Sequence, residues 1–189
     1  MTALILIDVQ VGFNDSYWGR RNNPRFEANI SRILERWRGA GLPVIHVQHH
    51  SVEPHSPLRP DRPGVEFMAC ARPQVGEPVF AKKVNSAFIH TGLESYLRAA
   101  GTHSIVMVGL TTDHCVSTSA RMAANLGFKV TIPADAVATF DRRTHDGMFI
   151  PADTVHEVSL ASLHGEFAAV TSLADLLETP EKQGVFLSI

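Results

Sequence analysis

The fold is constrained most by a regular alternation between short, strongly apolar runs and segments with helical periodicity. In the helical segments, apolar residues recur every three or four positions. Strands of near-continuous apolar character are buried on both faces, which is typical of parallel strands joined by helices. The sequence therefore predicts an α/β protein: a three-layer α/β/α sandwich around a six-stranded, mostly parallel sheet.

The expected elements follow from the same alternation. Strands are expected at residues 3–9, 43–48, 78–81, 104–109, 128–132 and 167–171. Helices are expected at residues 25–39, 92–100, 113–126 and 152–163, with a last short helix from Leu173. Residues 49–76 and 139–151 lack a clear period, so we expect loops that shape a pocket, with plain surface excursions as the alternative.

Length and composition fit one globular domain over residues 1–189. The chain is 44% hydrophobic and 19% charged, which allows a sizeable core. A net charge of -2 gives no reason to expect nucleic acid or an anionic membrane as a partner, so a small-molecule substrate is expected.

The cysteine count and the start of the chain indicate a compartment. The apolar start is interrupted by Asp8, so it reads neither as a signal peptide nor as a transmembrane span. Two cysteines are too few for a disulfide framework, and we expect a cytoplasmic protein.

Cys115 stands where a buried strand turns into a helix. With Thr112 or Asp113 as N-cap, the thiol falls in the first helical turn, where free N–H groups favour an anion. We therefore expect a thiol that ionises more readily than usual. A buried structural cysteine is the alternative, but ligands of open α/β sheets bind at the carboxyl ends of strands, which favours a nucleophile.

Two charged residues also follow predicted strands. Asp8 ends the first strand, and Lys82 follows the strand at residues 78–81. Taken alone, Asp8 could be a turn or capping residue, and Lys82 with Lys83 could be a solvated basic pair. Beside a thiol, the carboxylate could accept its proton, and the lysine would stabilise the thiolate.

Three motifs together carry a resemblance to a known family. They are Asp8-Val-Gln with Phe13 beyond it, Lys82-Lys-Val-Asn-Ser-Ala-Phe, and Gly109-Leu-Thr-Thr-Asp-His-Cys-Val. In this order, each at a predicted strand end, they resemble the isochorismatase-like cysteine hydrolases. This family includes nicotinamidases, N-carbamoylsarcosine amidohydrolases and ureidoacrylate hydrolases. The resemblance spans nearly the whole chain and implies the strand order 321456.

The resemblance implies a catalytic triad of Asp8, Lys82 and Cys115. It also implies a cis peptide bond between Leu110 and Thr111, which would turn the Thr111 N–H toward the same point as the Cys115 N–H and form an oxyanion hole. The activity implied is hydrolysis of an amide-type C–N bond through a thioester. No cofactor is expected, and a homo-oligomer, dimer or tetramer, is implied.

Further residues are expected to face the substrate or a metal. Gln10, Phe13, His49 and Phe88 are the candidate substrate-binding residues. Nicotinamidases hold a zinc-type ion with an Asp-x-His element and a further histidine. Here His49, His50 and His55 are weak candidate ligands, but the Asp-x-His element is absent, so no metal is expected.

Three other functions stay open. The first is hydrolysis of the vinyl ether of isochorismate. Family members with that activity have no cysteine at the nucleophile position, whereas Cys115 is present here. Cys115 could instead be a redox-sensing thiol, which would not need Asp8 or Lys82. The chain could also be a catalytically silent binding domain on an enzyme fold.

Overall fold

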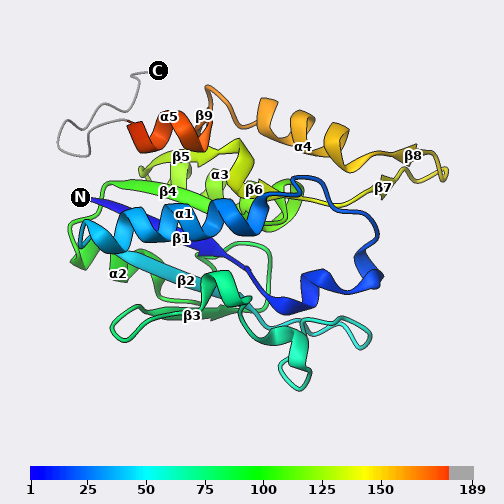
Figure 1. Cartoon of the computed structure of the whole chain (residues 1–189), viewed down its shortest axis with the longest axis horizontal. Coiled ribbons are helices and arrows are strands. Elements are labelled where there is room, and N and C mark those ends of the chain that lie inside the picture. Colours follow the sequence, from blue (N-terminus) through cyan, green and yellow to red (C-terminus); the bar gives the residue numbers. More distant parts are fainter. Residues whose placement is uncertain (179–189) are drawn as a thin grey trace.

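A parallel sheet forms the middle layer of the protein, for which the computed structural model describes residues 1–178 (Figure 1). Its strand order is β3-β2-β1-β4-β5-β9 with every neighbouring pair parallel, which confirms the expected order 321456. A short strand, β6 (Val137–Ala138), also pairs with the end of β4. The main strands are β1 (Thr2–Ile7), β2 (Val44–His49), β3 (Val79–Lys82), β4 (Ser104–Leu110), β5 (Lys129–Pro133) and β9 (Ala169–Thr171).

The alternation of side chains along β1 explains why helices cover both faces of the sheet. Ile5 and Ile7 belong to one apolar cluster, and Leu4 and Leu6 belong to another on the opposite face. Every one of these side chains is at most 1% exposed. Each face of the strand therefore needs an apolar helical partner.

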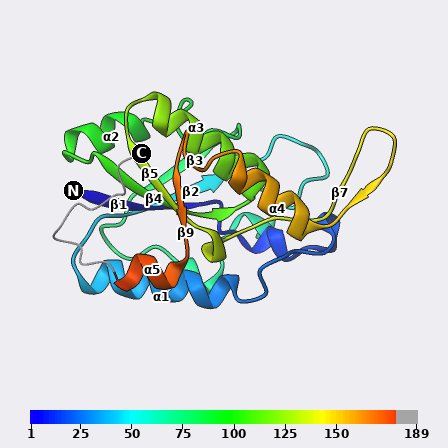
Figure 2. The same ribbon diagram turned by 90° about the horizontal axis from the view of Figure 1, so that it is seen from above.

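Helices supply these partners on the two faces (Figure 2). On one face, α1 (Phe26–Gly39) buries Ile30, Ile33 and Trp37, which helical periodicity places on a single stripe, and α5 lies beside it. On the other face lie α2 and α3. The remaining helices are α2 (Leu93–Ala99), α3 (Ser117–Asn125), α4 (Ala152–Ala161) and α5 (Leu173–Glu178).

The segment between β4 and α3 differs from the single helix expected there. Thr112–Val116 forms a turn of π-helix, in which the Val116 N–H donates to the Thr111 carbonyl at 3.1 Å. Neither Thr112 nor Asp113 is the N-cap; Thr111 holds that position without a side-chain hydrogen bond. The Asp113 carboxylate instead accepts a hydrogen bond from Arg142, which lies in a hairpin distant in sequence.

That hairpin corrects the second expected loop. Within residues 139–151, β7 (Arg142–Arg143) and β8 (Phe149–Ile150) pair antiparallel, and the hairpin projects beyond the sheet (Figure 2). The first expected loop, after β2, contains only short 3-10 turns at Pro63–Val65 and Ala69–Ala71.

The ends of β1 and β4 lie unusually close together. Gly109 has φ +122°, and a Cβ atom there would lie 2.0 Å from the Ile7 carbonyl oxygen, so only glycine fits. Asp8 follows directly with φ +52°, so the chain leaves the sheet one residue after β1 ends. Within residues 1–178, no helix has both the length and the apolarity to cross a bilayer.

Candidate active site

Asp8, Lys82 and Cys115 meet at the carboxyl edge of the sheet. Lys82 is the last residue of β3, Asp8 follows β1, and Cys115 lies in the π-helical turn after β4. The Lys82 Nζ lies 2.6 Å from Asp8 Oδ2 and 3.3 Å from Cys115 Sγ. Adjacent parallel strands end at the same edge, which is why residues far apart in sequence converge here.

Burial sets the charges of this cluster. Asp8 is fully buried, Lys82 is 2% exposed and Cys115 is 8% exposed. Burial raises the pKa of Asp8, and the Lys82 ammonium opposes that rise. Burial alone would lower the pKa of Lys82, but the neighbouring Asp8 and Cys115 raise it, so the ammonium form persists.

The prediction that the Cys115 thiol ionises more readily than usual is wrong. Burial and then the Asp8 carboxylate raise the pKa of Cys115 well above its usual range, and Lys82 offsets this only in part. At neutral pH the sulfur therefore keeps its proton and needs a base. Among the described residues, Asp8 Oδ1 has no hydrogen-bond partner, and it is the carboxylate oxygen left to accept that proton.

The backbone before the cysteine has the expected geometry. The peptide bond between Leu110 and Thr111 is cis, as predicted. Thr111 is 3% exposed and begins the turn that carries Cys115. The N–H groups of Thr111 and Cys115 remain the candidates for an oxyanion hole.

Gln10 and His49 act together in the structure. Gln10 Oε1 accepts from the His49 N–H at 2.8 Å, and Gln10 Nε2 donates to the His49 and Val65 carbonyls at 3.0 and 2.9 Å. The buried Gln10 amide thus holds the backbone instead of offering free groups to a substrate. The His49 ring lies against the triad, with Nδ1 3.0 Å from Lys82 Nζ.

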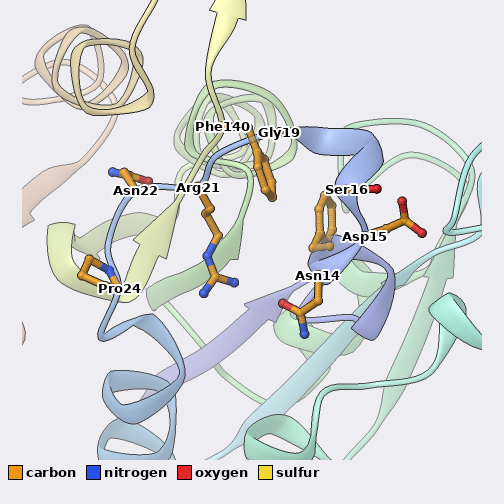
Figure 3. A pocket seen from close by; sticks show the side chains of 9 residues that line it. Asn14, Asp15, Ser16, Gly19, Arg21, Asn22, Pro24 and Phe140 are labelled. Carbon is orange, nitrogen blue, oxygen red and sulfur yellow. The ribbon is translucent and has the colours of Figure 1, made fainter.

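The two phenylalanines expected to face the substrate, Phe13 and Phe88, make contacts with other aromatic rings, and their role toward a substrate stays a prediction. Phe13 stacks on Phe140 at 6.0 Å and lines a pocket of about 350 Å³ (Figure 3). Arg21 and Asn14 flank that pocket, and none of the three triad residues lines it. Phe88 packs on Phe128 at 6.1 Å against the core cluster of the α2 and α3 face.

The three histidines considered as weak metal ligands do not come together at one point. His50 bonds to the Gln48 side chain, and His55 is exposed. Within residues 1–178, the potential ligand atoms that converge belong to Asp8, His49 and Cys115, within 4.8 Å of one another. The Lys82 ammonium lies at hydrogen-bond distance from all three, so this donor set already surrounds a cation and does not fit a resident metal.

Two contacts near Cys115 were not expected from the sequence. The Cys115 thiol lies 3.8 Å from Asn85 Oδ1. Asn85 belongs to the motif that begins at Lys82, and this membership is the one sequence signal that could have indicated the contact. Arg142 Nε donates to Asp113 Oδ2 at 2.8 Å, which ties the projecting hairpin to the turn that carries Cys115. No local pattern marks that long-range pair.

Comparisons with known proteins show which family the chain belongs to. The model of the isochorismatase domain matches residues 2–175. YrdC of Bacillus subtilis, an isochorismatase-family protein, is 45% identical over 93% of this chain and 94% of its own length. A streptothricin hydrolase of Streptomyces noursei is 34% identical over 74% of this chain and 50% of its own length.

Solved structures give the same answer for the fold. An isochorismatase-family protein from Chromobacterium violaceum is 46% identical, with a TM-score of 0.89 over 93% of this chain and 91% of its own. The family model, the relatives and the similarity of the fold all agree. The chain therefore belongs to the isochorismatase family of hydrolases.

Proposed function

We propose that this protein is a cysteine hydrolase that cleaves an amide-type C–N bond of a small molecule through a thioester on Cys115. One observation carries the proposal: a buried Lys82 ammonium bridges a buried carboxylate, at 2.6 Å, and a thiol, at 3.3 Å. Such an arrangement provides a nucleophile, its base and a group that balances both charges.

The proposed reaction begins with the protonated thiol. Asp8 Oδ1 takes the proton from Cys115 Sγ as the sulfur attacks the substrate carbonyl carbon. The Thr111 and Cys115 N–H groups donate to the oxyanion of the tetrahedral intermediate. When the C–N bond breaks, Asp8 returns the proton to the leaving nitrogen, which departs as ammonia or an amine.

The second half of the reaction uses water. Asp8 removes a proton from a water molecule that attacks the thioester carbonyl, and the C–S bond then breaks. The sulfur regains a proton, a carboxylic acid leaves, and the enzyme returns to its starting state. Throughout, Lys82 stays positively charged and stabilises whichever of Asp8 and Cys115 carries the negative charge.

The relatives support a C–N bond as the target. Two of them are named maleamate amidohydrolase and nicotinamidase. A different relative is named an isochorismatase effector, which keeps vinyl ether hydrolysis as the rival reaction. Cys115 favours the amidase, because a general acid alone would suffice for the vinyl ether.

A panel of small primary amides, including maleamate and nicotinamide, tests the proposal with ammonia as the readout. Cys115→Ala, Asp8→Asn and Lys82→Met should each abolish ammonia release while circular dichroism stays unchanged. Cys70→Ala removes the other cysteine and is the matched control, with activity retained.

Other outcomes would point to the rival functions. Pyruvate release from isochorismate, without ammonia from any amide, would identify the vinyl ether reaction. Oxidation of the thiol that is lost in Cys115→Ala but kept in the Asp8 and Lys82 variants would favour the redox-sensing function. Full ammonia release by Cys115→Ala would reject the thioester.

A further inference from the structure

The Lys82 ammonium has as many acceptors as it has N–H bonds. Its three partners are Asp8 Oδ2 at 2.6 Å, His49 Nδ1 at 3.0 Å and Cys115 Sγ at 3.3 Å. Two of these acceptors belong to the proposed triad. The third, His49, comes from the end of β2 and completes the shell around the ammonium.

The His49 ring is a neutral acceptor. Burial, and then the charges of Lys82 and His50, lowers the pKa of His49 to about 4. A neutral imidazole carries one ring hydrogen, and Nδ1 accepts from Lys82, so the hydrogen must be on Nε2. The contact with Lys82 thus fixes the tautomer.

The backbone of His49 is held in place by a buried side chain. Gln10, which is 0% exposed, uses both ends of its amide on the N–H and the carbonyl of His49. His49 is also the register partner of Lys82 in the β2–β3 pair. The Gln10 Nε2 also donates to the Val65 carbonyl at 2.9 Å, so this fully buried amide joins the His49 backbone to a second segment and supports it rigidly.

The Nε2 atom of His49 faces away from these contacts. Among residues 1–178, no side chain or backbone group accepts a hydrogen bond from it, and the residue is only half-buried. A donor without a partner therefore lies on the ring that contacts the Lys82 ammonium of the triad.

We propose that His49 is a positioning residue that holds the Lys82 ammonium through Nδ1 and donates its Nε2–H to an oxygen of the bound substrate. The first half concerns the free enzyme alone, whereas the second half rests on the proposed amide hydrolysis. It favours amides that carry an acceptor oxygen close to the scissile bond.

Nitrogen NMR of protein labelled with ¹⁵N-histidine tests the first half without any substrate. The His49 signal is identified as the one missing from His49→Asn. At pH 7 it should show an unprotonated Nδ1 and a protonated Nε2. The ring should stay neutral down to about pH 5, because burial and then the facing charges of Lys82 and His50 lower its pKa. A protonated Nδ1, in either the neutral or the charged ring, would overturn the proposal even if the enzyme is an amidase.

Two substitutions test the second half, with maleamate or whichever panel amide is turned over faster. His49→Asn keeps an acceptor near the place of Nδ1 but loses the Nε2–H, so KM should rise about ten-fold while kcat changes less than about three-fold. His49→Leu also removes the acceptor for Lys82, so kcat should fall by a further factor of about ten.

The matched control is His103→Asn, which replaces an exposed histidine just before β4 and should leave both constants unchanged. Equal kinetics of His49→Asn and His49→Leu, or wild-type kinetics of both, would overturn the proposal. If His49→Leu does not fold, the KM and kcat of His49→Asn and the tautomer still decide it. A proposed function that fails altogether leaves the NMR result intact, so the two failures are distinguishable.

Discussion

Among single residues, Lys82 determines what the cluster at the sheet edge can be. Its ammonium lies where Asp8, His49 and Cys115 converge, a set of oxygen, nitrogen and sulfur atoms that would otherwise suit zinc. The same ammonium that excludes a metal also pairs with the buried Asp8 carboxylate, whose charge would otherwise be unpaired. The cluster is thus an internal ion pair with a thiol beside it.

Removal of the Lys82 ammonium should turn this cluster into a metal site. We expect Lys82→Ala, incubated with zinc and desalted, to retain about one equivalent by elemental analysis, and wild type far less. The double variant Lys82→Ala, His49→Leu is the control and should lose most of that zinc. Stoichiometric zinc in the wild-type protein would contradict this account.

The raised pKa of the thiol gives a second test at the same scale. Asp8 raises the pKa of Cys115, so Asp8→Asn should lower it and leave the Lys82 ammonium to favour the thiolate. In a Cys70→Ala background at pH 7.5, iodoacetamide should alkylate Asp8→Asn about ten-fold faster than the parent, although hydrolysis is lost. Slower alkylation would show that Asp8 does not oppose ionisation of the thiol.

At the scale of elements, the close approach of β1 and β4 aligns the ends that carry Asp8 and Cys115. In Gly109→Ala, the new Cβ would lie 2.0 Å from the Ile7 carbonyl, at a φ that side chains rarely adopt. Urea unfolding should show a loss of at least about 3 kcal/mol. The control, Gly127→Ala, has a positive φ but open space around its Cβ and should lose only about 1 kcal/mol. Equal losses of unfolding free energy in the two variants would mean that the close approach of β1 and β4 does not require glycine at position 109.

The strands were predictable from the sequence, but several contacts between elements were not. The apolar runs predicted the six strands and hence which residues end them, because the polar residue that ends each buried run is visible in the sequence. Asp8 and Lys82 were therefore predictable. The π-helical turn, the β7–β8 hairpin and the Arg142–Asp113 contact were not, since each depends on long-range hydrogen bonds that leave no local periodicity.

The pKa of Cys115 shows a second limit of the sequence. Its place in the first turn after β4 suggested an easily ionised thiol, but burial and the Asp8 carboxylate have the larger effect. Gln10 shows the same limit, because its amide is hydrogen-bonded to the backbone of His49 and Val65. A motif indicates which residues gather at a site, whereas their protonation and partners depend on the packed structure.

At the scale of the whole molecule, Glu77 links the helix layer to the sheet. Its carboxylate accepts from Arg38 Nε of α1 at 2.7 Å and contacts His46 Nε2 of β2 at 2.8 Å. These partners and the Gln74 N–H outweigh burial and hold the pKa of Glu77 at about 2. The unfolded chain has the ordinary value, so the stabilisation is complete above about pH 4.5 and is lost as the pH falls toward 2.

Glu77→Gln tests this linkage by urea denaturation. At pH 7 the variant should be less stable by about 2 kcal/mol, and at pH 3.5 the difference should shrink by about 1 kcal/mol. Glu94→Gln on the exposed surface of α2, which breaks a pair with Arg98, is the control and should change stability by less than about 0.5 kcal/mol. A Glu77→Gln effect that does not depend on pH would contradict the assigned pKa.

Assembly stays a prediction at this scale. The expected homo-oligomer, dimer or tetramer, can be measured by light scattering of the purified protein. Within residues 1–178, Met148 and Phe149 near the tip of the β7–β8 hairpin are 62% and 53% exposed, so their burial in an assembly is measurable by hydrogen exchange.

Rapid-quench mass spectrometry tests the central claim most directly. The protein is mixed with the most active amide of the panel, quenched in acid within the first turnover and digested. The account predicts the acyl mass on the peptide that contains Cys115, and its absence in Cys115→Ala. Ammonia release at full rate with no acyl group on Cys115 at any quench time would contradict it.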